Sequence, residues 1–123
     1  MAGTTKYILV VEDDAAISGA IKEWLEDNGY KVECAPNGQE ALNVIDQNFV
    51  PNLILLDLMM PVMDGFEFSH KRAVHPIIKD TPMVVMSADG NVTRKQQQTK
   101  ALDYLKKPVD IFKLLETVKK HIA

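Results

Sequence analysis

The chain has 123 residues, of which 46% are hydrophobic and 25% are charged, and its formal net charge at pH 7 is -3. We expect one domain, residues 1–123 with a core of about 6–122, and neither a disordered chain nor a nucleic-acid binder that relies on bulk positive charge. No run suits a membrane span and the N-terminus lacks the apolar region of a secretory signal, which predicts a cytoplasmic protein without membrane contact.

The first predicted strand is the apolar run Tyr7–Val11. A helix follows, because apolar residues recur at the spacing of one helical face and Asn28-Gly29 provides a stop. These apolar residues are Ile17, Ala20, Ile21, Trp24 and Leu25. The more alternating segment Lys31–Ala35 predicts a second strand, in which the single cysteine, Cys34, is interpreted as a packed small hydrophobe.

The next helix is predicted to begin after Asn37, which stands three residues before Glu40 in a capping-box-like arrangement. Its inward residues are expected to be Ala41, Leu42 and Ile45. The apolar run 53–56 then predicts a strand buried on both faces, and it leads directly into Asp57.

A third helix is predicted over residues 66–74, followed by a strand over residues 83–86 and a weaker strand over residues 103–105. The last helix has one apolar stripe, made by Ile111, Leu114, Leu115, Val118 and Ile122. The segment 91–100 is almost entirely polar, so a helix there would bury little and is expected to be short, mobile or held by a partner.

Strands and helices therefore alternate along the chain, which predicts an α/β fold with an open, doubly wound parallel sheet of five strands and helices on both faces. In such sheets, ligands bind beyond the C-terminal ends of the strands. The chemically active residues of this chain all lie at the ends of predicted strands. They are Glu12 and Asp13 after the first strand, Asp57 after the third, Ser87 after the fourth and Lys107 after the fifth.

Three carboxylates at one edge would repel one another unless a cation lay among them, and oxygen ligands suit Mg²⁺. Lys107 and Ser87 are explained if an anion, such as a phosphoryl group, also binds there. Asp57 could then attack that group and form an aspartyl phosphate. For Asp57 alone, a helix cap or turn is an equally good interpretation.

The chain resembles the receiver domain of two-component response regulators over nearly its whole length. The resemblance lies in Ile-Leu-Val-Val-Glu12-Asp13-Asp14, Leu-Leu-Asp57-Leu-Met-Met-Pro61-Val-Met-Asp64-Gly65, Met-Ser87-Ala and Tyr104-Leu-Lys-Lys107-Pro108. It implies a flavodoxin-like sheet of order 2-1-3-4-5, as in the single-domain chemotaxis regulators, and a cis Lys107-Pro108 bond.

The resemblance also implies roles for single residues. Asp57 would be the phosphoacceptor, with Ser87 and Lys107 on the phosphoryl oxygens and Tyr104 as a switch that follows Ser87. The implied Mg²⁺ ligands are Glu12, Asp13, Asp57 and the main-chain carbonyl of Met59. No further cofactor is implied.

Other polar residues have structural interpretations. Asp14 is expected to cap the first helix more readily than to contact metal, and Asp64-Gly65 is expected to form a turn before the third helix. The three histidines, His70, His75 and His121, lie on separate predicted segments without metal-ligand spacing, so solvated or capping positions are expected for them.

The preferred hypothesis is a phosphoacceptor signalling module rather than an enzyme acting on other substrates. By resemblance, its partners would be a histidine kinase or phosphotransfer protein, docking near Ile17, and a downstream protein target. A homodimer formed on phosphorylation is a further expected partner. No DNA-binding segment follows the last helix, so the readout is expected to be a protein contact or a phosphorelay step, unless the chain is part of a larger protein.

Two alternatives belong to other classes. A phosphohydrolase with Asp57 as nucleophile, of the haloacid-dehalogenase kind, would need a second acid where this chain has Met59, and a cap over the substrate. A pseudo-receiver that only binds partners would lack an acid, the acceptor or the lysine, and all of these are present.

Overall fold

The computed structural model describes residues 5–46, 49–58, 63–88 and 99–123. Within them the strands are β1 (Tyr7–Val11), β2 (Lys31–Ala35), β3 (Leu53–Asp57), β4 (Met83–Ser87) and β5 (Asp103–Lys106). The helices are α1 (Ala15–Glu26), α2 (Gly38–Val44), α3 (Gly65–Ala73) and α5 (Ile111–His121). The predicted strands and the four predicted helices outside the polar segment 91–100 are therefore confirmed, with small shifts at their ends.

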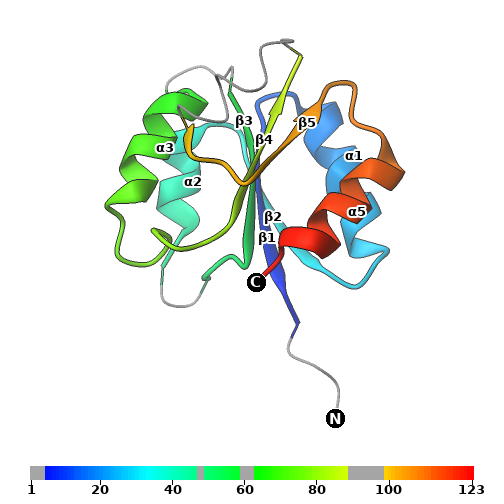
Figure 1. The fold of residues 1–123 in the computed structure, drawn as a ribbon, viewed down its shortest axis with the longest axis horizontal. Helices are drawn as coiled ribbons and strands as arrows, with labels where there is room; N and C mark the ends of the chain where they lie inside the picture. The colour runs from blue at the N-terminus through cyan, green and yellow to red at the C-terminus, as the bar shows by residue number, and fades with distance from the viewer. Residues whose placement is uncertain (1–4, 47–48, 59–62, 89–98) are drawn as a thin grey trace.

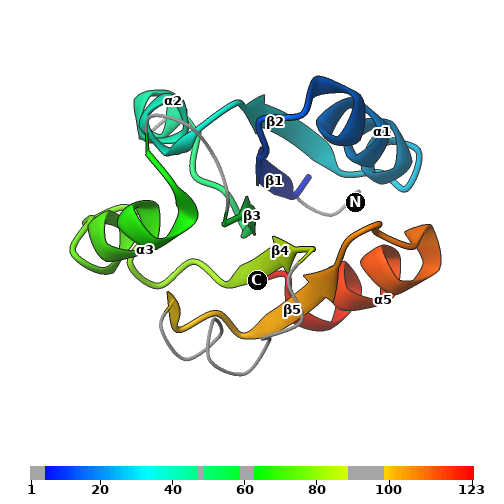
Figure 2. The ribbon, with the colours of Figure 1, turned by 90° about the horizontal axis from the view of Figure 1, so that it is seen from above.

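The strands form one parallel sheet of order β2-β1-β3-β4-β5, as the resemblance implied. Helices α1 and α5 cover one face of this sheet, and α2 and α3 cover the other (Figures 1 and 2). Because each crossover connection returns the chain to the same end of the sheet, all strands run in one direction. Their C-terminal ends therefore meet at one edge, the upper edge in Figure 1.

Two apolar cores lie on the two faces of the sheet, because side chains alternate along each strand. In β1, Ile8 and Val10 pack toward α1 and α5, whereas Leu9 and Val11 pack toward α2 and α3, and all four are fully buried. β3 is buried along its whole length. The central strands are therefore held from both sides and give the residues at their ends a rigid base.

Some helix ends differ from the predicted ones. α2 ends at Val44, and Ile45 is buried beyond it in extended backbone, so Ile45 faces the core but not from the helix. α3 begins at Gly65 and ends at Ala73, which leaves Val74 outside the helix and 81% exposed. Of the polar segment 91–100, only residues 99 and 100 belong to the described part of the chain, and the prediction for the rest lies outside it.

No helix in the described ranges is both long and apolar enough to cross a membrane. The Lys107-Pro108 peptide bond is cis, as the resemblance implied.

Candidate functional site

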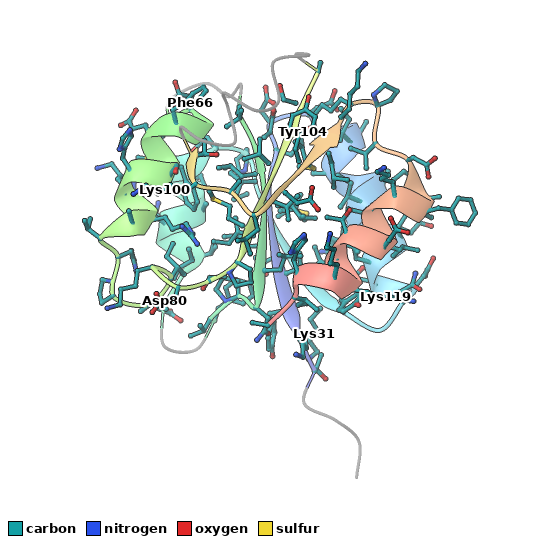
Figure 3. All side chains as sticks on the ribbon, in the orientation of Figure 1. Lys31, Phe66, Asp80, Lys100, Tyr104 and Lys119 are labelled. Atoms are coloured by element: carbon teal, nitrogen blue, oxygen red, sulfur yellow. The ribbon has the colours of Figure 1, made fainter. Side chains whose placement is uncertain are left out.

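Residues predicted to be chemically active converge at the C-terminal edge of the sheet. Glu12 follows β1 directly, Asp57 is the last residue of β3, and Ser87 is the last residue of β4. Lys107 follows β5, and Figure 3 shows Tyr104 of β5 near the same end of the molecule. Because β1, β3, β4 and β5 are consecutive neighbours in the sheet, one edge collects all of these residues.

Three carboxylates form a cluster at this edge. Oxygen atoms of Glu12, Asp13 and Asp57 all lie within 4.8 Å of one another. Glu12 is 2% exposed and Asp57 is 3% exposed, whereas Asp13 faces the solvent. A cluster that is buried on one side and open on the other can admit a small ion from solution.

An ammonium group lies against this cluster. The Nζ atom of Lys107 is 2.5 Å from Oε1 of Glu12 and 3.3 Å from Oδ2 of Asp57. Its own backbone N–H donates to the carbonyl of Ser87 at 2.9 Å, which holds the start of the loop against β4. Lys107 is therefore positioned to neutralise part of the charge of two buried carboxylates.

The surroundings alter the acidity of this pair. Burial raises the pKa of Glu12 to about 7, and the hydrogen bond and negative charge of Asp57 act in the same direction, against the opposing effect of Lys107. Burial alone would lower the pKa of Lys107. The hydrogen bond to Glu12 and the charge of Asp57 outweigh it and raise that pKa. Lys107 is therefore positively charged at pH 7, whereas Glu12 titrates near that pH.

One carboxylate oxygen of Glu12 lacks a partner. Its Oε2 atom is buried and accepts no hydrogen bond from the described residues. An unsatisfied buried acceptor costs about 1–3 kcal/mol, and more when it is charged. A cation bound among the carboxylates would remove that cost, and an all-oxygen donor set fits Mg²⁺. Met59, whose carbonyl was predicted to complete the metal site, lies outside the described residues.

Ser87 links β4 to the loop and to Tyr104. Ser87 is 2% exposed. Its main-chain carbonyl accepts one hydrogen bond from the N–H of Lys107 and another, at 3.0 Å, from the hydroxyl of Tyr104. Tyr104 is half-buried and packs on the α2 and α3 side of the sheet. A change at Ser87 would therefore reach both Lys107 and Tyr104.

A groove of about 260 Å³ opens beside the carboxylate cluster. Its walls are α1 and the loop after β5, and its lining is mostly apolar. The lining residues are Ala16, Ile17, Ala20, Ile21, Trp24, Lys107, Pro108 and Val109. Lys107 lines the groove and also contacts Glu12 and Asp57, so the groove adjoins the cluster at Lys107.

Two further acids near the site cap helices. Asp14 accepts hydrogen bonds from the backbone N–H groups of Ala16 and Ile17, so the prediction that it caps the first helix is confirmed. Asp64 accepts from the N–H of Glu67 and caps α3. Both side chains are therefore occupied by helix ends.

Two features of the structure have no local signal in the sequence. His121, expected to be solvated or capping, instead pairs with Asp103 at 2.9 Å across α5 and β5, and its side chain is only 14% exposed. Gly65 packs directly on the backbone of Asp57 and Leu58. Both depend on contacts between separate elements, which residue spacing along the chain does not reveal.

Comparison with known proteins agrees with this arrangement. A family model described as the response regulator receiver domain matches residues 8–119. The chain is 39% identical over 118 residues to the transcriptional regulatory protein CrdR of Helicobacter pylori, covering 94% of this chain and 54% of that protein. It is 35% identical to an uncharacterized 14.6 kDa protein of Leptolyngbya boryana, covering 93% of this chain and 88% of that one.

Among solved structures, the chemotaxis protein CheY4 of Vibrio cholerae superposes with a TM-score of 0.89 at 30% identity, covering 97% of this chain and 100% of that chain. The chain spans about half the length of curated relatives such as CrdR.

Proposed function

The chain belongs to the response regulator receiver domain family, and from this membership we propose that it is a phosphoacceptor signalling module whose acceptor is Asp57. The observation that carries the proposal is the cluster of Glu12, Asp13 and Asp57 with the ammonium of Lys107 against it. Acids for a metal, a carboxylate nucleophile and a cation for a phosphoryl group are the parts that phosphoryl transfer requires.

In the proposed reaction, an oxygen of Asp57 attacks the phosphorus atom of a phosphohistidine on a histidine kinase or phosphotransfer protein. A new P–O bond forms while the P–N bond breaks, and the imidazole nitrogen keeps the electron pair of the broken bond. β3 is buried along its whole length, which holds the Asp57 carboxylate in place for an in-line approach. Hydrolysis of the acyl phosphate later restores the carboxylate and releases inorganic phosphate.

Glu12, Asp13 and Asp57 would hold Mg²⁺, together with the carbonyl of Met59. Bound there, Mg²⁺ would neutralise negative charge that develops on the transferring group. The unpartnered buried oxygen of Glu12 supports this assignment, because a cation would satisfy it. Asp13, the exposed member of the cluster, lies where an ion from solution would arrive first.

We propose that the side chain of Lys107 changes its partner when the site is loaded. In the described structure its ammonium lies closer to Glu12 than to Asp57, at 2.5 Å against 3.3 Å. When metal occupies the acids, Lys107 would turn from Glu12 to a phosphoryl oxygen, and the hydroxyl of Ser87 would bind another. Each contact places positive charge or a donor where the phosphoryl group carries negative charge.

Tyr104 would transmit the change. The Ser87 carbonyl accepts from both Tyr104 and the N–H of Lys107, so movement of Ser87 and Lys107 toward the anion would disturb the hydrogen bond of Tyr104. A different position of Tyr104 would alter the surface around β5 and bias an equilibrium between two states. A downstream protein, or a second copy of the chain, would read that surface.

The phosphoryl donor would dock in the groove between α1 and the loop after β5. A donor must bring its phosphoryl group to Asp57, so its contact surface must adjoin the carboxylate cluster. The groove does so through Lys107, and its apolar lining, with Ile17 and Trp24, suits the apolar face of a helix that carries the donor histidine.

Incubation with Mg²⁺ and acetyl phosphate tests the proposal. Intact-mass measurement should find one phosphoryl group per chain in the native protein and none in Asp57→Asn. Asp14→Asn is the matched control, because Asp14 is a neighbouring acid that caps a helix, and it should be phosphorylated normally. Phosphorylation that persists in Asp57→Asn would refute the acceptor assignment, and turnover of phosphoesters far above one per chain would favour a phosphohydrolase.

A further inference from the structure

The backbone at Gly65 lies unusually close to the residue that carries the acceptor carboxylate. Gly65 is buried at the start of α3, and its N–H donates to the carbonyl of Leu58 at 3.0 Å. A Cβ atom built on Gly65 would lie 2.7 Å from Cα of Leu58 and 2.8 Å from the main-chain oxygen of Asp57. Such approaches are well inside van der Waals contact, so a side chain at residue 65 requires the backbone to move.

The other crowded glycine in the described residues differs in what it faces. A Cβ on Gly38 would meet Cγ and Sδ of Met63 at 2.8 and 2.9 Å and, less closely, Cβ of Phe68 at 3.1 Å. Methionine is flexible, so its side chain can turn away. A Cβ on Gly19, within α1, would meet nothing within 4 Å. The contact at Gly65 therefore combines crowding with backbone partners that cannot rotate aside.

We infer that Gly65 is a positioning residue for phosphoryl transfer: the missing side chain lets α3 press against the Asp57-Leu58 peptide and fixes the acceptor carboxylate relative to Glu12 and Lys107. The inference rests on the proposed role of Asp57 as acceptor. Gly65 would act through its contact with the main chain of Asp57 and Leu58 and with the Leu58 side chain, whose Cδ2 a Cβ at residue 65 would meet at 2.7 Å.

Both elements that meet at Gly65, α3 and β3, are held in place by other contacts. α3 is held by the cap that Asp64 forms and by Phe68, which is fully buried one turn into the helix. β3 is held by its pairing with β1 and β4, up to the partnership of Asp57 with Met86. An added methyl group would press directly on the Asp57-Leu58 peptide, because its nearest neighbours include Cα of Leu58 and the main-chain oxygen of Asp57.

The displacement would change the distances that define the site. Lys107 lies 3.3 Å from Asp57, and the three carboxylates lie within 4.8 Å of one another, so shifts of several tenths of an ångström alter both. Loss of an outer contact that orients a metal ligand typically lowers metal affinity or activity by about 10–100-fold. For Gly65→Ala we therefore expect Mg²⁺ to bind at least about tenfold more weakly than in the native protein.

The experiment compares Gly65→Ala with Gly38→Ala and Gly19→Ala. Mg²⁺ affinity is measured by calorimetry, the phosphorylation rate with acetyl phosphate at saturating Mg²⁺, and stability by urea unfolding. Gly65→Ala should lose both Mg²⁺ affinity and rate. Gly38→Ala should lose stability while its Mg²⁺ affinity stays within about twofold of the native value, since side-chain crowding at Met63 is relieved locally. Gly19→Ala should keep both Mg²⁺ affinity and rate.

A metal-free measurement separates displacement from general loosening. In the absence of Mg²⁺, the amide ¹⁵N chemical shifts of Asp57 and Leu58 should change more in Gly65→Ala than those of β1. If Gly65→Ala unfolds in buffer, the comparison is repeated with trimethylamine N-oxide, which favours the folded state.

Loss of stability in Gly65→Ala with native Mg²⁺ affinity and native rate would overturn the inference. Equal losses of affinity in Gly38→Ala and Gly65→Ala would do the same. Failure of the native protein to be phosphorylated at Asp57 would instead refute the proposed function, so the two failures are distinct.

Discussion

The ammonium of Lys107 lies 2.5 Å from a carboxylate oxygen of Glu12, at the place where the acids would hold a metal ion. If Mg²⁺ binds there as proposed, Lys107 and Mg²⁺ would compete for the same carboxylate. This relationship explains how a metal-free protein tolerates two buried acids side by side, and it leads to the first two predictions.

Replacement of Lys107 by Met should strengthen Mg²⁺ binding about fivefold or more, because the ammonium no longer competes for Glu12. The metal-free protein should also become less stable, since Glu12 and Asp57 lose their counter-charge. Calorimetric titration with Mg²⁺ measures the affinity. Lys106→Met is the control, because Lys106 is an exposed neighbour and should leave the affinity unchanged. Equal or weaker Mg²⁺ binding in Lys107→Met would contradict the competition.

Mg²⁺ binding should depend on pH through Glu12, whose pKa is raised by burial to about 7. Below that pH Glu12 carries a proton that metal must displace, so affinity should fall as pH decreases from about 8 to 6, with up to one proton released per ion. Calorimetry in buffers of different ionisation enthalpy counts the protons. Glu12→Gln should bind Mg²⁺ weakly and with a flatter pH profile, and an unchanged profile would exclude Glu12 as the titrating group.

The same pKa has a consequence for folding. The pKa of Glu12 is higher in the folded protein than its ordinary value of 4.5, so the folded state binds this proton more tightly than the unfolded state does. The resulting contribution to the free energy of unfolding is complete below pH 4.5 and is lost as pH rises through about 7. The metal-free protein should therefore lose part of its stability over that range, and Mg²⁺ should restore it above pH 7. Urea unfolding with and without Mg²⁺ checks both changes, and a Mg²⁺ effect that is larger at pH 5 than at pH 8 would reverse the expected sign.

Removal of the Tyr104 hydroxyl should cost little stability. Tyr104→Phe deletes the 3.0 Å hydrogen bond to the Ser87 carbonyl, but that carbonyl keeps the N–H of Lys107, so we expect a loss of about 0.5–1.5 kcal/mol in urea unfolding. Tyr104→Ala should still accept phosphate, because the Tyr104 hydroxyl donates to a main-chain carbonyl, that of Ser87, while partner binding should respond less to phosphorylation. Abolished phosphorylation in Tyr104→Phe would assign the hydroxyl to the reaction itself.

Lys100 has a left-handed backbone, with φ of 58°. Residues with a Cβ atom pay about 1–2 kcal/mol for this conformation, whereas glycine adopts it freely but loses more entropy on folding. Lys100→Gly should therefore raise the free energy of unfolding by up to about 1 kcal/mol, and Lys100→Val should lower it by about 1 kcal/mol. Urea unfolding checks both variants, with Lys120→Gly near the end of α5 as a glycine substitution expected to destabilise. A loss of stability in Lys100→Gly would contradict the expectation.

Much of the fold was predictable because its signals are local. The apolar runs of β1, β3 and β4, the helical stripe of α5 and the cap at Asp14 each lie within one segment of chain. Helix ends were less predictable, as Ile45 and Val74 illustrate: both are apolar residues beyond a helix end, one of them buried and the other exposed. Periodicity identifies an apolar face but does not locate the last hydrogen-bonded turn.

The members of the candidate site were also predictable. A parallel sheet brings its C-terminal strand ends to one edge, so Glu12, Asp57 and Lys107 had to approach one another once the fold class was inferred. Their mutual distances were not. The sequence predicted repulsion among acids and an anion beside Lys107, whereas the structure places the ammonium itself against Glu12. This arrangement depends on the register of β3, β4 and β5 and on burial, which no single segment specifies.

The sequence by itself therefore determined which elements form and which chemically active residues end them, because hydrophobic periodicity and strand-end position are properties of short segments. Tertiary structure alone decided that the ammonium of Lys107 would lie against Glu12 and that His121 would pair with Asp103. It also decided that Gly65 would pack on the backbone of Asp57. Each of these contacts joins separate elements. The distance across each contact follows from how the strands pair and how the helices pack, which no single segment of the sequence specifies.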